Sequence, residues 1–226
     1  MSGEPRQRWR VVFRRSAAAA GLGGREVQAA IETNLAAAGV PTAGRIQLAA
    51  GLPIGLALES EPLDVTLTER WDVLRARAAL AAALPAGHEL VDCHDVWLGE
   101  PALAAQACGA DYRIVIKDGS PSAATLRSAA AALLDSGSIE RVRPKGGRTV
   151  AYDLRPLLED VAIETDAPEI VLRISVRIDP ERGAGRPEEV VAALADRSGA
   201  SALVIEVATR LQIRLAGAGP EIAPAG

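Results

Sequence analysis

Aromatic residues, cysteine, histidine and lysine are all scarce in this chain, and each scarcity excludes something. Aromatic side chains make up 3%, so Val, Leu, Ile and Ala must build the core. The two cysteines, Cys93 and Cys108, are too few for a disulfide framework or a cysteine-bound cluster. No apolar run approaches the ~20 residues of a membrane helix, and no signal peptide is recognisable. We therefore expect a cytoplasmic protein that binds no metal and no other cofactor.

The charge balance argues against a protein that coats nucleic acid through its global charge, because the net charge is −4. Only Lys117 and Lys145 of the 25 basic residues are lysine. One interpretation of this preference for arginine over lysine is a GC-rich genome. The alternative is that arginine serves bidentate contacts to phosphate or carboxylate. The 226 residues suffice for one large domain or two small ones, each with a real core.

Hydrophobic periodicity predicts two successive β-α-β-β-α-β units. In the first unit, residues 8–15 alternate as in a half-buried strand, and Val27, Ile31 and Leu35 recur at the spacing of a helix. The expected strands of this unit are 8–15, 45–49, 63–68 and 88–98, and its expected helices are 25–40 and 71–84. The second unit has expected strands at 111–117, 169–178 and 201–215, and helices at 122–137 and 186–199. Residues 139–161 should hold a strand, a basic turn and a further segment.

This element order predicts an α+β fold of two tandem ferredoxin-like units, each with two helices on one face of an antiparallel sheet. The predicted organisation is a flexible N-terminus (1–7), a first unit (8–98), a linker (99–110), a second unit (111–215) and a disordered tail (216–226). The two halves share this order of elements but show no convincing sequence identity.

An acidic stretch within "GLPIGLALESEPLDVTLTE" contains Glu59, Glu61 and Asp64. Such carboxylates could perform acid–base chemistry or hold Mg²⁺. No nucleophile or further fixed ligand lies nearby in the sequence, and Glu61–Pro62 resembles a solvated turn that leads into a strand. We therefore interpret the three residues as candidates for contact with a partner, and catalysis by them as a remaining alternative.

Two further segments carry weaker signals. "HELVDCHD" holds both histidines, His88 and His94, together with Asp92, Cys93 and Asp95, but Cys93 should point to the opposite face and a structural zinc site needs four ligands. "GLGG", residues 21–24, precedes a helix and could hold an anion, but it lacks the spacing and the lysine of a P-loop. We expect an exposed strand end and a loop, respectively.

The most basic segment is "ERVRPKGGRTVAYDLRP", in which "PKGG" predicts a hairpin turn with charges at its tip. The strand at 169–178 presents arginines on its outer face, and the strand at 111–117 adds Arg113 and Lys117. These cations could contact a phosphate backbone, although Tyr112 is in phase with the core and offers no platform for base stacking. The candidates for RNA or anion binding are Arg141, Arg143, Lys145, Arg148, Arg155, Arg173 and Arg177.

The ordered segments "WRVVFRR", "LPIGLALESEPLDVTL", "ADYRIVI", "RVRPKGGRTVAYDLRPLLEDV", "GRPEEVVAAL" and "TRLQI" resemble the radical SAM-linked protein family, a domain of unknown function. The resemblance covers about residues 8–215. It implies an accessory role beside a radical SAM enzyme, around RNA or translation, with no assigned catalytic residues. The "YDLRP" match makes Asp153, Arg155 and Pro156 candidates for a family-specific surface, with Asp153 a further partner contact.

The chain also departs from that family. Similar proteins carry histidine-bearing segments where this chain reads "AAAAGLGGRE" and "TAGRIQLAAG". Any function of those histidines is lost or changed here, and a radical SAM partner would act in trans. The leading hypothesis is a non-catalytic accessory protein rather than an enzyme. The alternatives are an RNA-binding module that uses the basic hairpin, and an enzyme that uses the acidic stretch.

Overall fold

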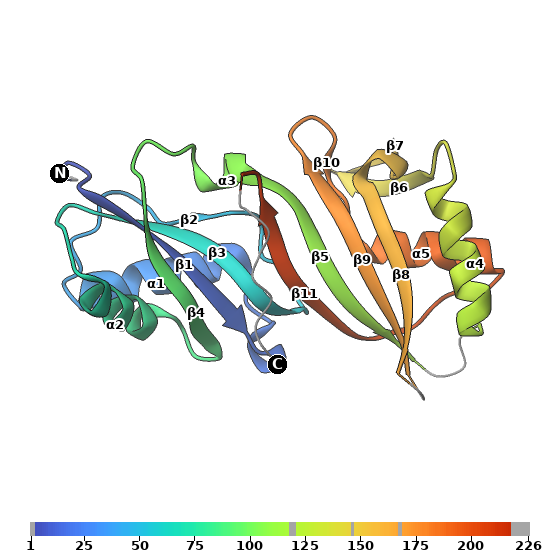
Figure 1. Cartoon of the computed structure of the whole chain (residues 1–226), viewed down its shortest axis with the longest axis horizontal. Coiled ribbons are helices and arrows are strands. Elements are labelled where there is room, and N and C mark those ends of the chain that lie inside the picture. The colour runs from blue at the N-terminus through green and yellow to red at the C-terminus, as the bar shows by residue number, and fades with distance from the viewer. Residues whose placement is uncertain (1–2, 118–120, 146, 167–168, 218–226) are drawn as a thin grey trace. The chain divides into compact units, whose positions relative to one another are not determined.

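The computed structural model describes residues 3–117, 121–145, 147–166 and 169–217, without the side chains of residues 143–145, 165 and 166. The chain divides into two compact α+β units (Figure 1). Unit 1 comprises Met1–Ala107 and Gln212–Gly226, and unit 2 comprises Cys108–Leu211. None of the helices in the described ranges is long and apolar enough to cross a membrane.

Unit 1 contains an antiparallel sheet in the order β4-β1-β3-β2, in which β1 pairs with β3 and β4, and β2 pairs with β3. The elements follow the order predicted from periodicity. Their bounds are β1 (Gln7–Arg15), η1 (Ala17–Ala19), α1 (Gly24–Ala37), β2 (Gln47–Leu48), β3 (Ala57–Leu67), α2 (Val73–Ala83), β4 (His88–Val96) and α3 (Leu103–Gln106).

The core of unit 1 lies between α1, α2 and one face of this sheet. Val27, Ile31 and Leu35 of α1 are buried against Trp9, Val11 and Phe13 of β1, with Ala76 and Leu80 of α2, as the spacing predicts. Fully burying a side chain of this size contributes about 1.5–3 kcal/mol. The N-terminus of α2 is capped by Asp72, whose carboxylate accepts a hydrogen bond from Arg75 N at 2.9 Å.

In unit 2, β8 pairs with β9, β9 with β5, and β5 neighbours β11. A separate two-stranded ribbon, β6–β7, follows α4. The bounds are β5 (Ala107–Ile116), α4 (Ala123–Leu134), β6 (Glu140–Lys145), β7 (Arg148–Asp153), η2 (Arg155–Leu157), β8 (Leu158–Asp166), β9 (Glu169–Asp179), β10 (Gly183–Ala184), α5 (Pro187–Ser198) and β11 (Ile205–Leu215).

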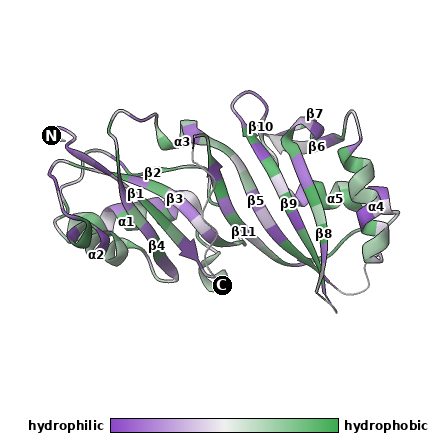
Figure 2. Cartoon of the chain, in the orientation of Figure 1, coloured by the Kyte–Doolittle hydropathy of each residue, from purple (hydrophilic) through white to green (hydrophobic). Residues whose placement is uncertain are grey.

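The core of unit 2 uses the predicted phases of β5 and β9. Tyr112 and Ile114 lie opposite Ile174 and Leu172 across the pair, and these four residues are buried together with Ile116 and Val176. Hydrophilic and hydrophobic bands therefore alternate along β9 (Figure 2). Helix α5 begins with Pro187 and acidic residues in its first turn, and it ends at Gly199, whose φ of 76° suits glycine.

The structure corrects two expectations about the chain's organisation. The further segment predicted after the basic turn comprises β7, η2 and the start of β8, and β8 is a full strand that periodicity did not identify. The stretch that contains Glu59, Glu61 and Asp64 is not a solvated turn, because all three lie within β3 and both Glu61 and Asp64 are buried. The predicted linker at 99–110 holds α3 and the start of β5. Most of the expected tail, residues 218–226, lies outside the described residues.

Candidate nucleic-acid interface

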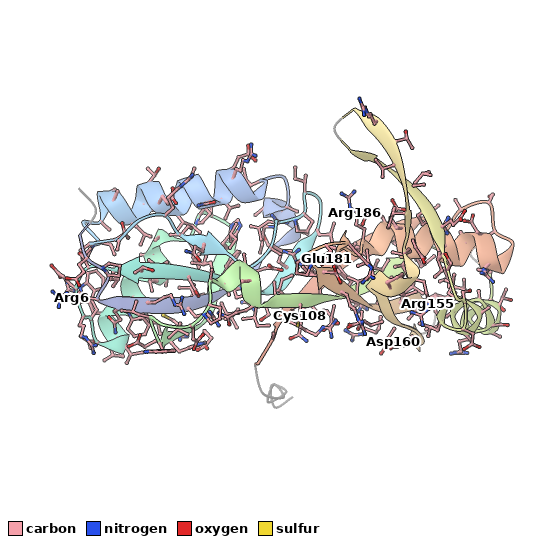
Figure 3. All side chains as sticks on the ribbon, turned by 90° about the horizontal axis from the view of Figure 1, so that it is seen from above. Arg6, Cys108, Arg155, Asp160, Glu181 and Arg186 are labelled. Atoms are coloured by element: carbon pink, nitrogen blue, oxygen red, sulfur yellow. The ribbon has the colours of Figure 1, made fainter. Side chains whose placement is uncertain are left out.

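The predicted basic hairpin is the ribbon formed by β6 and β7. Its register runs from Glu140↔Asp153 at the base to Lys145↔Arg148 near the tip. Figure 3 shows the ribbon extending away from the rest of unit 2, with Arg155 near its foot. Within the described residues neither strand pairs with a third strand, so the outer edges of both keep backbone donors and acceptors available.

Asp153 fixes the base of the ribbon. Its Oδ1 accepts hydrogen bonds from Ile139 N at 2.8 Å and from Arg155 N at 2.9 Å, and Leu154 N donates to Ile139 O at 2.8 Å. The bond from Ile139 N is the largest influence that lowers the pKa of this carboxyl below its usual range. Asp153, which the sequence suggested as a partner contact, therefore stabilises the base of the ribbon.

Arg155 joins the ribbon to α4 and β8. Its Nε and Nη2 donate to Leu134 O at 3.1 and 2.7 Å, its Nε also donates to Ser136 O, and its Nη1 donates to Leu158 O at 2.8 Å. The guanidinium thus satisfies carbonyl groups at and just after the C-terminus of α4, where a cation is favoured. The "DLRP" segment is therefore a structural corner at which the chain turns from the ribbon into β8. Because its donors are used by these carbonyl groups, Arg155 is less able to bind RNA than a cation without such bonds.

The shaft and tip of the ribbon hold the remaining cations. Arg141 binds Asp196 of α5 with an Nη1–Oδ2 distance of 2.6 Å, which ties the shaft to the body of the unit. The side chains of Arg143 and Lys145 lie outside the described part of the structure. Arg148 is exposed, as are Val142 and Val150. The surface of the ribbon is therefore a mixture of cations and aliphatic side chains.

The arginines of the outer face of β9 are paired with carboxylates of β8. Arg173 Nε lies 3.1 Å from Glu164 Oε2, and Arg177 Nε lies 3.0 Å from Glu159 Oε1. Tyr112 is buried in the core, as its phase predicted, so it presents no ring on this face. The face is therefore a set of ion pairs with few uncompensated cations.

The acidic stretch of β3 does not form a carboxylate cluster at the surface. Asp64 is buried and accepts a bidentate hydrogen bond from Arg10, while Glu61 is 1% exposed; only Glu59 is exposed. The three residues cannot all reach one solvent-borne substrate without rearrangement of β3. Contact with a partner stays a prediction that Glu59 satisfies most directly.

Sequence reasoning missed the polar network that surrounds Asp64. Arg8 donates to Trp97 O at 2.8 Å and to Glu100 O at 3.2 Å, and Arg10 also approaches Gln106 Oε1 at 3.5 Å. The alternation in β1 placed Arg8 and Arg10 on a face expected to be solvated, yet both are buried. One sequence signal could have revealed the network. Asp64 alternates with the apolar Leu63 and Val65 and so lies on the other face of β3, where it is the register partner of Arg10.

The histidine segment forms no ligand set. The expected exposed strand end is wrong for His88, which is buried beside Phe13 with ring centroids 5.6 Å apart. His94 is exposed, and its Nδ1 lies 2.9 Å from Asp92 Oδ2. Burial raises the pKa of the Cys93 thiol to about 11. Among the residues that the structure describes, no three His, Cys, Asp or Glu side chains are grouped to hold a metal ion.

The loop "GLGG" ends at a capped helix. The Glu26 carboxylate accepts a hydrogen bond from Gly23 N at 2.7 Å and so occupies the N-terminus of α1 with a negative charge of the chain itself. A second anion there would be repelled, and the sequence-based alternative of an anion site loses its support.

The fold and the surface define an α+β protein of two units, one of which carries an exposed basic ribbon. Residues 8–187 match the family described as "Uncharacterized protein conserved in bacteria (DUF2344)". The match covers most of the chain, so the protein belongs to this family. No curated protein matches its sequence.

Two solved structures are similar to this chain at low identity. A chain of the crystal structure of a Cbf5-Nop10-Gar1 complex aligns with a TM-score of 0.53 and 11% identity, over 89% of this chain and 47% of that chain. A chain of the archaeal box H/ACA sRNP Nop10-Cbf5 complex aligns with a TM-score of 0.49 and 13% identity, over 89% and 46%. This protein thus spans about half the length of both, and the likeness concerns the fold alone.

Proposed function

We propose that this protein is a non-catalytic accessory protein that binds RNA through the β6–β7 ribbon of unit 2. The observation that carries the proposal is the ribbon itself. It extends from the unit, it is anchored at its base by Asp153 and Arg155, and it displays the exposed Arg148 beside the positions of Arg143 and Lys145. Cations held on a projecting ribbon can reach a phosphate backbone that the body of an acidic protein would repel.

The side chains of the ribbon favour backbone contacts over the reading of bases. Tyr152 is the single aromatic residue of β6 and β7, and it is half-buried near the base. Stacking of single-stranded bases needs exposed rings, whereas guanidinium and ammonium groups bind phosphate oxygens of any sequence. The proposal therefore predicts binding that depends steeply on salt and weakly on sequence.

The deciding experiment compares two triple variants of the full chain that remove the same charge. Changing Arg143, Lys145 and Arg148 to alanine should weaken RNA binding measured by fluorescence anisotropy, and should reduce the slope of log K against log salt by about two to three. The matched control changes Arg25, Arg45 and Arg70, all exposed in unit 1, and should have little effect. Salt-insensitive binding, or equal losses in the two variants, would reject the proposal.

The second candidate function rests on family membership together with the resemblance to radical SAM-linked proteins. We propose that the chain acts with a radical SAM enzyme in trans, in the cytoplasm. The strand orders β4-β1-β3-β2 and β11-β5-β9-β8, together with the element order, support an interpretation of both units as ferredoxin-like, with the ribbon as an insertion in the second. Capture of such an enzyme from native cytosol after nuclease treatment would support this role, and recovery of partners only without nuclease would assign them to RNA.

A further inference from the structure

The outer face of the unit 2 sheet holds two guanidinium groups directly opposite each other. Arg113 of β5 and Arg173 of β9 are register partners in an antiparallel pair, and both are half-buried. Opposite residues have Cβ atoms about 4.5–5.5 Å apart, and like charges at that separation destabilise a sheet. A nearby negative charge is therefore needed to offset the repulsion between these two cations, more than for a single solvated arginine.

Only Arg173 of this pair has a carboxylate partner among the described residues, which is Glu164. Glu164 binds Nε of Arg173 at 3.1 Å, which leaves both Nη nitrogens of Arg173 without a hydrogen bond in the described part of the chain. Across the same described ranges, the side chain of Arg113 has no hydrogen bond or ion pair. Two arginines at one position of the face therefore carry donors that have no acceptor in the described part of the chain.

The neighbours of the pair limit the size of what can bind. Ala162 of β8 flanks Arg173 on its other side, and its small exposed side chain leaves room there. The adjacent row places Asp111 and Asp160 on either side of Ser175. These carboxylates would repel a second anionic group in that direction, while the hydroxyl of Ser175 is a further donor.

We propose that Arg113 and Arg173 together bind a single phosphate group. Each planar guanidinium donates two parallel hydrogen bonds to phosphate oxygens, and the anion relieves the repulsion between the two cations. The group is either free phosphate or one phosphate of an RNA backbone. In the second case the inference rests on the RNA-binding function proposed above.

The first arm of the test measures thermal unfolding of the full chain in inorganic phosphate and in chloride at equal ionic strength. Phosphate should raise the Tm of the wild type and should not raise that of Arg113→Ala. Without phosphate, Arg113→Ala should be at least as stable as the wild type, because it removes a like-charge contact. Glu164→Gln frees Arg173 and should increase the phosphate effect. The control Arg177→Ala removes a cation opposite Gly109 and should keep the wild-type response.

The second arm measures the salt dependence of RNA binding. If free phosphate has no effect but Arg113→Ala lowers the slope of log K against log salt by about one, the phosphate belongs to RNA. If Arg113→Ala changes neither the phosphate response nor the slope, or behaves as Arg177→Ala does, the site does not exist. The ribbon triple variant separates the two proposals, since it should abolish most RNA binding and leave the response to free phosphate intact.

Discussion

Arg10 of β1 and Asp64 of β3 are register partners, and the guanidinium of one holds both carboxylate oxygens of the other. The Nε–Oδ1 distance is 2.9 Å and the Nη2–Oδ2 distance is 3.0 Å, with Asp64 2% exposed. A pair removed from water in this way gains little over apolar packing. Loss of Asp64, however, leaves the buried Arg10 with only the more distant carboxylate of Glu100, 3.9 Å from its Nη2.

Asp64→Asn should accordingly lower the free energy of unfolding of unit 1 by about 3–5 kcal/mol. Urea denaturation of the full chain followed by tryptophan fluorescence measures this, since all three tryptophans belong to unit 1. The control Glu89→Gln breaks an exposed ion pair with Arg14 and should cost at most ~1 kcal/mol. Equal midpoints for the two variants would show that the Arg10–Asp64 pair is not a stabilising element.

Arg155→Lys should destabilise unit 2 by about 2 kcal/mol. Lysine keeps the charge, but it cannot donate in several fixed directions to Leu134 O, Ser136 O and Leu158 O at once. Thermal unfolding should show a Tm lowered by roughly 8 °C or more, and limited proteolysis should cut near the foot of the ribbon sooner. Arg148→Lys, at an exposed position, should change the Tm little. A Tm for Arg155→Lys within error of the wild type would contradict the corner role.

Stability should fall as the pH is lowered through the range in which His88 is protonated in the unfolded chain. Burial is the main cause that lowers the pKa of His88 below its ordinary 6.5, so the unfolded state binds more protons than the folded state near that pH. The contribution is present above 6.5 and is lost as the pH falls toward the folded pKa. Urea midpoints between pH 8 and 5 measure the slope, and His88→Gln should flatten it. An unchanged slope in that variant would assign the effect to other groups.

The two cysteines should differ sharply in alkylation by iodoacetamide. Cys108 is exposed, whereas Cys93 is 5% exposed and its pKa of about 11 leaves roughly one thiolate in a thousand at pH 8. Mass spectrometry of the folded chain should therefore find label on Cys108 long before Cys93. Denaturant should remove the difference. Comparable labelling of both in the folded state would show that β4 opens readily.

The sequence predicted those parts of the fold whose cause is local. The helix stripe of Val27, Ile31 and Leu35 and the alternation of Leu172, Ile174 and Val176 arise from a single buried face, and each was predicted correctly. Strand β8 was missed because its charged residues interrupt the alternation, and its position depends on pairing with β9. Non-local pairing is not visible in the periodicity of one segment.

The candidate site shows the same division. A hairpin with basic residues at its tip could be predicted from "PKGG", because turn chemistry is local. The partners of Asp64 and Arg155 could not, since they lie 54 and 21 residues away along the chain. The wrong prediction of a solvated turn at Glu61–Pro62 arose from reading proline and charge as signs of exposure, whereas tertiary pairing buried both residues.

The base of the ribbon has a consequence for how this family can diversify. Leu154 N and Ile139 O, on either side of the ribbon, lie 2.8 Å apart and already form a hydrogen bond. A chain that left out residues 140–153 would need to bridge hardly any distance between α4 and β8, and the sheet of unit 2 would keep every strand pair it has. We therefore expect that the ribbon can be shortened or exchanged while the strand pairing of the rest of unit 2 is kept.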